Sequence, residues 1–110
     1  MLMDGQDAIS VQQLAAWQDS NAAHVILDVR EAEELAICRF ETALHIPMQQ
    51  IPSRLAELPV DEPVVIICHH GMRSMHVVNF LRDAGRHNVI NLDGGIDAWA
   101  RQVDTAMARY

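Results

Sequence analysis

Apolar positions along the chain alternate between short continuous runs and runs with a helical period. Mostly apolar runs rich in β-branched residues occupy 24–29, 64–67 and 89–92, each of a length typical of a buried strand. Between them, apolar residues recur every three or four positions, as on one face of a helix. Strands separated by helices predict an α/β fold in which a mainly parallel sheet is covered by helices on both faces.

The expected helices have recognisable ends. Ser10 has the side chain of an N-cap, and Gly85 stands where a helix commonly terminates. Gly94 and Gly95 form a break before a last helical run, and no third glycine completes a dinucleotide fingerprint. The remaining predicted elements are helices over 11–18, 31–37, 51–58 (beginning near Pro52) and 74–84, a short strand over 43–46, and a tail over 103–110 that wraps over the surface.

Length, composition and charge limit the class of protein to which the chain can belong. The chain has 110 residues, half of them apolar, which suits one compact domain. A formal net charge of −7, from 15 acidic and 8 basic residues, argues against nucleic-acid binding. The first seven residues lack the pattern of a signal peptide, and no apolar segment approaches the roughly 18 residues needed to span a bilayer. The expectation is a cytoplasmic protein with no membrane partner.

The strongest chemical signal lies where the run at 64–67 ends in a cysteine. Cys68 is followed by a short loop and then by a helical period, so its thiol is expected at the carboxyl end of a strand, facing the start of a helix. Backbone amides and the helix dipole favour an anion there. In parallel sheets, ligands bind beyond the carboxyl ends of the strands. Both arguments make Cys68 a candidate nucleophile.

Three motifs resemble those of the rhodanese-like domain, in its order and at its separations. They are Leu-Asp-Val-Arg-Glu at 27–31, Cys-His-His-Gly-Met-Arg-Ser at 68–74 and Leu-Asp-Gly-Gly-Ile-Asp-Ala-Trp at 92–99. The resemblance spans residues 8–102 and is to the free-standing, single-domain bacterial type. It implies one rhodanese-like three-layer domain over 1–110, with 103–110 as a tail.

The resemblance implies a sulfurtransferase that needs no cofactor. Cys68 would attack the outer sulfur of thiosulfate or a similar donor and release sulfite. It would then carry a persulfide to an acceptor, either cyanide or a thiol of a small molecule or protein. The backbone amides of His69, Gly71 and Met72 would surround the sulfur, and Gly71 would allow the tight curl of the loop.

The charged and imidazole side chains of the loop have two interpretations each. Arg73 can pair with a surface carboxylate, but its forked guanidinium favours binding of an anionic donor. His69 and His70 can support the thiolate electrostatically or stand exposed without a catalytic part. A metal site is not expected, because no second Cys/His pair is spaced to complete four ligands. The predicted catalytic residue is therefore Cys68, and the predicted substrate-binding residues are His69, His70, Gly71, Met72 and Arg73.

The segment at 38–43 departs from the family pattern, because it lacks a usual Pro and Gly. Its change is expected to alter acceptor choice rather than to abolish chemistry. Cys38 can serve as a resolving thiol for Cys68, although burial beside apolar neighbours is the simpler interpretation. Asp28 and Arg30 are expected to form a structural ion pair or to anchor a loop, and Trp99 to lie in the core.

Two other functions compete with sulfur transfer. Tyrosine phosphatases also place a cysteine and an arginine in a loop before a helix. The four residues between Cys68 and Arg73 make a loop one residue shorter than theirs, which suits a smaller sulfur group. A non-catalytic binding module is the second alternative, because a fold alone never establishes activity. The presence of both Cys68 and Gly71 favours a catalytic domain over a binding module.

Overall fold

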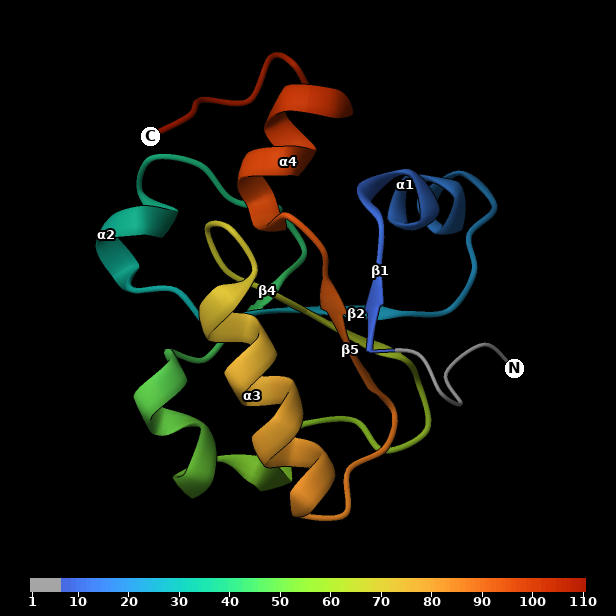
Figure 1. The fold of residues 1–110 in the computed structure, drawn as a ribbon, viewed down its shortest axis with the longest axis vertical. Coiled ribbons are helices and arrows are strands. Elements are labelled where there is room, and N and C mark those ends of the chain that lie inside the picture. The colour runs from blue at the N-terminus through green and yellow to red at the C-terminus, as the bar shows by residue number, and fades with distance from the viewer. Residues whose placement is uncertain (1–6) are drawn as a thin grey trace.

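The computed structural model describes residues 7–110 and has a parallel sheet at its centre. Its five strands are paired in the order β1-β5-β4-β2-β3, and each pair of neighbours runs parallel (Figure 1). The strands are β1 (Ala8–Ile9), β2 (Val25–Asp28), β3 (Leu44–His45), β4 (Val64–Ile67) and β5 (Val89–Leu92). The predicted parallel sheet is confirmed. The expectation about a signal peptide concerns mainly residues 1–6, which lie outside the described residues.

Helices follow the strands as the hydrophobic pattern predicts. The α-helices of the described part of the chain are α1 (Val11–Asp19), α2 (Ala32–Leu35), α3 (Met72–Asp83) and α4 (Gly95–Gln102). Ser10 caps α1 as predicted, because its Oγ accepts from the amide of Gln13 while the Gln13 side chain accepts from the Ser10 amide. Gly85, with φ of 89°, follows α3 in the left-handed conformation that ends many helices.

The helix predicted over 51–58 is wrong in type. The chain there forms two 3-10 helices, η1 (Met48–Ser53) and η2 (Leu55–Glu57). Pro52 lies inside η1 and has no N–H to donate to a helical ladder, so a regular α-helix across this position would lose a hydrogen bond. The segment still packs Ile51, Leu55 and Leu58 into one hydrophobic cluster, which explains the apolar period in the sequence.

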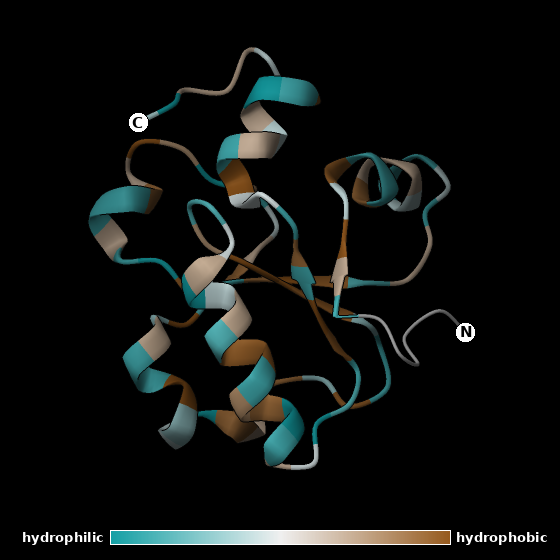
Figure 2. Cartoon of the chain, in the orientation of Figure 1, coloured by the Kyte–Doolittle hydropathy of each residue, from teal (hydrophilic) through white to brown (hydrophobic). Residues whose placement is uncertain are grey.

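Alternating residues of the strands build two hydrophobic clusters, one on each face of the sheet. Val65 and Ile67 of β4 point into a cluster that α1 and α4 cover, together with Trp99. Val64 and Ile66 point into the opposite cluster, which α3, η1 and η2 cover. Figure 2 shows the central strands largely brown and the helices with both brown and teal residues, as expected for a three-layer arrangement.

Several single-residue predictions are also confirmed by the packing. Asp28 and Arg30 form a fully buried ion pair with N and O atoms 2.7 Å apart. Trp99 is buried and packs on Phe40, with ring centroids 5.0 Å apart, so the segment 38–43 is anchored in the α1/α4 cluster. Cys38 is buried there too. No helix among residues 7–110 combines the length and apolarity needed to cross a bilayer.

Candidate active site

Cys68 lies directly after β4, the middle strand of the sheet, at the start of the loop that leads into α3. Its side chain is 1% exposed. Two amides at the start of α4 hold the loop from the other side: Ile96 N donates to Cys68 O at 2.9 Å, and Asp97 N donates to His69 O at 3.0 Å. The loop is thus fixed between two helix N-termini, and its backbone has little freedom.

Three donors surround the sulfur of Cys68. The amide of Gly71 lies 3.1 Å from Sγ, the amide of Ser74 lies 3.4 Å away and the Ser74 hydroxyl 3.3 Å away. Gly71 has φ of 100°, a left-handed conformation that places its amide under the sulfur and that a residue with a Cβ adopts only with strain. Of the predicted amides, the structure brings Gly71 to the sulfur. Those of His69 and Met72 are not among its donors within residues 7–110.

Ser74 and Asn91 form a buried polar link behind the sulfur. The Ser74 hydroxyl is hydrogen-bonded to Oδ1 of Asn91, and Nδ2 of Asn91 donates to Gly71 O at 3.2 Å. Because a hydroxyl has one hydrogen, Ser74 can give it either to Asn91 or to the sulfur. Sequence reasoning assigned neither residue to the site. The available signal was a polar residue in each of two buried stripes, on α3 and on β5.

Gly95 lets α4 approach the loop more closely than any other residue would. A Cβ at this position would lie 2.4 Å from His69 O and 2.6 Å from Cys68 O. The backbone φ of 64° is also left-handed. The Gly94-Gly95 break predicted from the sequence therefore brings two α4 amides within hydrogen-bonding distance of the loop carbonyls.

Arg73, on the first turn of α3, is held by a carboxylate of α2. Its Nη1 and Nη2 donate to the two carboxylate oxygens of Glu34, at 2.7 and 2.8 Å. The hydrogen bonds from Arg73 lower the pKa of Glu34 to about 2, against the opposing effect of burial. The carboxylate pairing that was the alternative interpretation of Arg73 is therefore present, and binding of an anionic donor stays a prediction. A guanidinium has five N–H groups, so three remain for another anion.

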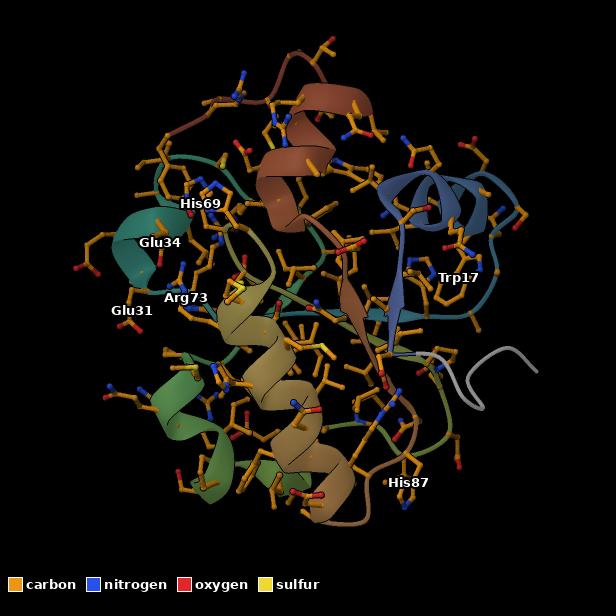
Figure 3. The ribbon with its side chains drawn as sticks, viewed as in Figure 1. Trp17, Glu31, Glu34, His69, Arg73 and His87 are labelled. Atoms are coloured by element: carbon orange, nitrogen blue, oxygen red, sulfur yellow. The ribbon has the colours of Figure 1, made fainter. Side chains whose placement is uncertain are left out.

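Tyr110 returns from the tail to the rim of the site. Its hydroxyl donates to Oε2 of Glu34 at 2.7 Å and accepts from Nη1 of Arg30 at 3.0 Å, while its ring stacks on His69 with centroids 3.8 Å apart. Burial raises the pKa of Tyr110 to about 12, so the phenol stays protonated. Figure 3 shows His69, Glu34 and Arg73 gathered on one side of the molecule, away from Trp17 and His87. The predicted wrapping of the tail thus reaches the site itself.

The two histidines of the loop differ in environment. Burial, with His70 beside it, lowers the pKa of His69, so its ring is a weaker source of positive charge than the sequence suggests. His70 is largely exposed, with Nε2 3.8 Å from Asp97 Oδ2. Ligand atoms of His69, His70 and Asp97 lie within 4.8 Å of one another. The Asp97 carboxylate already pairs with Arg101 and Arg109, at 2.9 and 3.5 Å. These two positive charges oppose the binding of a metal cation by the three residues.

The sequence and fold are similar to those of known proteins. The model of the rhodanese-like domain family matches residues 10–102. A protein of Allochromatium vinosum named sulfurtransferase is 41% identical over 90 residues, which cover 82% of this chain and 80% of that protein. The thiosulfate sulfurtransferase GlpE of Actinobacillus succinogenes is 36% identical, with 78% of each chain covered. The crystal structure of SSP1007 from Staphylococcus saprophyticus superimposes with a TM-score of 0.80 and 32% identity, covering 89% of this chain and 97% of the other.

Proposed function

Because the chain belongs to the rhodanese-like domain family, we propose that it is a sulfurtransferase in which Cys68 carries the transferred sulfur as a persulfide. The proposal rests on one observation above the others. Two backbone amides and one hydroxyl converge on the Cys68 sulfur, which is held at the start of a twelve-residue helix. Such donors stabilise negative charge on sulfur, both in the thiolate and in the persulfide anion that replaces it.

The proposed reaction proceeds in two steps. The Cys68 thiolate attacks the outer sulfur of thiosulfate, the S–S bond of the donor breaks with its electron pair leaving on sulfite, and a persulfide anion remains on the enzyme. A thiolate or cyanide then attacks the outer persulfide sulfur, and the Cys68 thiolate is the leaving group. Charge and electrons balance in each step without a cofactor.

Arg73 is the proposed binding group for an anionic donor. Three of its N–H groups are not used by Glu34, and a fork of such groups matches the oxygens of a sulfonate. We include His69, His70, Gly71 and Met72 as the other substrate-binding residues. Met72 and His70 are the two most exposed of the loop and would meet a donor or acceptor first. The names of the relatives agree with thiosulfate as one donor.

We propose that residues 8–102 form the single catalytic domain and that 103–110 is a tail that contributes Tyr110. The reaction requires a reduced Cys68, which a reducing compartment such as the cytoplasm supplies. The segment 38–43 remains a candidate for acceptor choice. Its residues 39–42, together with His24 and Trp99, line an open hollow of about 660 Å³.

Mass measurement of the intact protein tests the proposal. Incubation of the reduced protein with thiosulfate is expected to add one sulfur atom, and cyanide is expected to remove it. Cys68→Ser should gain nothing, whereas Cys38→Ser should gain sulfur like wild type. If thiosulfate and a small-molecule persulfide both fail to load the wild type, the chain is a binding module rather than a transferase. Release of phosphate from an aryl phosphate would instead favour the phosphatase alternative.

A further inference from the structure

Tyr110 contacts one end of the loop that carries Cys68 and is linked to the other end through Glu34. Its ring stacks almost parallel on His69, at an interplanar angle of 10°, and His69 directly follows the nucleophile. Its hydroxyl bonds to Glu34, which in turn holds Arg73 at the end of the loop. The tail segment is therefore built into the rim of the site by two separate contacts.

The hydroxyl contact forms part of a continuous chain of short hydrogen bonds. Nη1 of the buried Arg30 donates to the Tyr110 oxygen, Tyr110 donates to Glu34, and Glu34 accepts two bonds from Arg73. The amide of Glu31 adds another donor to the same carboxylate at 3.0 Å. Four donors fix the orientation of the Glu34 carboxylate. The carboxylate in turn fixes the orientation of the Arg73 guanidinium, because the two groups share two hydrogen bonds.

A simple anchor for the tail would not need this arrangement. Tyr110 as a whole remains 40% exposed, so it is not buried as an apolar anchor would be. The polar end of the side chain instead enters the gap between Arg30 and Glu34, where it bonds to both. The ring lies over His69, whose Nε2 is buried and has no hydrogen-bond partner among the described residues.

We propose that Tyr110 is a positioning residue of the active site, which fixes Arg73 through Glu34 so that the free edge of the guanidinium can receive the anionic end of the donor. This inference rests on the proposed function and deepens it, because it assigns donor selection to a segment outside the three family motifs. It predicts that anionic reagents depend on Tyr110, whereas neutral ones do not.

Alkylation of Cys68 tests the proposal without sulfur chemistry. Iodoacetate is an anion and iodoacetamide is its neutral counterpart, so the ratio of their rates at Cys68, followed by peptide mass, reports on the nearby guanidinium. Tyr110→Phe keeps the stacked ring and removes the hydroxyl. We expect this variant to lower the iodoacetate-to-iodoacetamide ratio about threefold, the size expected for loss of a modest interaction. Phe80→Ala, which removes an aromatic ring of similar exposure (42%) on the exposed side of α3, should keep the wild-type ratio.

A double variant tests whether Tyr110 affects the alkylation ratio through the guanidinium of Arg73. Arg73→Gln should lower the ratio at least as much as Tyr110→Phe, and combining the two should lower it no further, because both act through one guanidinium. Glu33→Gln, which removes a negative charge at an exposed neighbouring position on α2, should keep the wild-type ratio. A wild-type ratio in Tyr110→Phe, or additive losses in the double variant, would overturn the proposal.

The same variants connect the inference to sulfur transfer. Tyr110→Phe should raise the KM for thiosulfate about threefold and change kcat less than twofold, while transfer from a preloaded persulfide to cyanide stays as in wild type. A drop in kcat with unchanged KM would contradict positioning of the donor. If the wild type cannot be loaded with sulfur at all, the proposed function fails, and the alkylation ratio still decides the role of Tyr110.

Discussion

The hydroxyl of Ser74 lies 3.3 Å from the sulfur of Cys68 and is also hydrogen-bonded to the side chain of Asn91. One small side chain on the first turn of α3 thus joins the candidate nucleophile to strand β5. Both Ser74 and Asn91 are buried, so neither finds water as a replacement partner. The link makes the environment of the sulfur depend on a residue from a different strand.

Ser74→Ala should slow sulfur loading about tenfold, because it removes a hydroxyl whose single hydrogen can turn from Asn91 to the sulfur when the sulfur becomes charged. The rate of mass gain in a single turnover with thiosulfate measures this. Ser53→Ala makes the same change at an exposed position on η1, where the hydroxyl donates to Gln50 O, and should load at the wild-type rate. Equal rates for the two variants would show that the Ser74 hydroxyl does not act on the sulfur.

Gly95→Ala should destabilise the protein by more than about 2 kcal/mol, because its Cβ would meet the loop carbonyls at 2.4 and 2.6 Å. Gly85→Ala is the matched control. It has a similar left-handed φ of 89° but open space around its Cβ, so it should cost only about 1 kcal/mol. Urea denaturation of both variants checks the difference. Similar losses would mean that α4 can move away from the loop without cost.

Arg73→Ala should weaken thiosulfate use more than the transfer of a loaded persulfide to cyanide. The reason is that the guanidinium is proposed to bind the sulfonate end of the donor, which has left before the second step. Steady-state kinetics should show a KM for thiosulfate raised about tenfold or more. The second step is measured separately on protein loaded with sulfur beforehand. An unchanged KM would mean that Arg73 does not bind the donor and only pairs with Glu34.

Stability should fall in acid through Glu34. The folded pKa is about 2 and the ordinary value is 4.5, so the carboxylate stabilises the fold fully above pH 4.5. As the pH falls from there toward 2, the unfolded chain takes up a proton that the folded chain does not, and this contribution is lost. Glu34→Gln should therefore be less stable than wild type at pH 6, by about 1–2 kcal/mol, and the difference should shrink toward pH 3. Urea denaturation at several pH values measures it, with Glu33→Gln as the control, and a constant difference would contradict the assignment.

Much of the architecture could be predicted because it follows from local signals. The β-branched run before Cys68 and the helical period after it predicted β4 and α3, and with them the place of the thiol. The start of α1 at Ser10 and the end of α3 near Gly85 could be predicted for the same reason, since each signal acts on neighbouring residues. Strand β1 was missed because its two residues, Ala8 and Ile9, are too short a run to show a period.

The parts of the site that could not be predicted depend on contacts between distant segments. Glu34 and Arg73 lie 39 positions apart, and Tyr110 lies 76 positions from Glu34. Their pairing depends on how α2 and the tail pack around α3, which no periodicity reports. Ser74 was visible as a helical position, but its role became clear only when Asn91 of β5 was seen beside it.

The burial of the two cysteines in different clusters has a consequence for any sulfur stored on the protein. Cys68 belongs to the cluster under α3, and Cys38 to the cluster on the other face of the sheet. The chain has no third cysteine. A persulfide on Cys68 therefore has no neighbouring thiol in its own cluster with which to close a disulfide. The transferred sulfur would stay on Cys68 until an acceptor from outside the chain attacks it. Access of that acceptor to the loop would therefore set the lifetime of the persulfide.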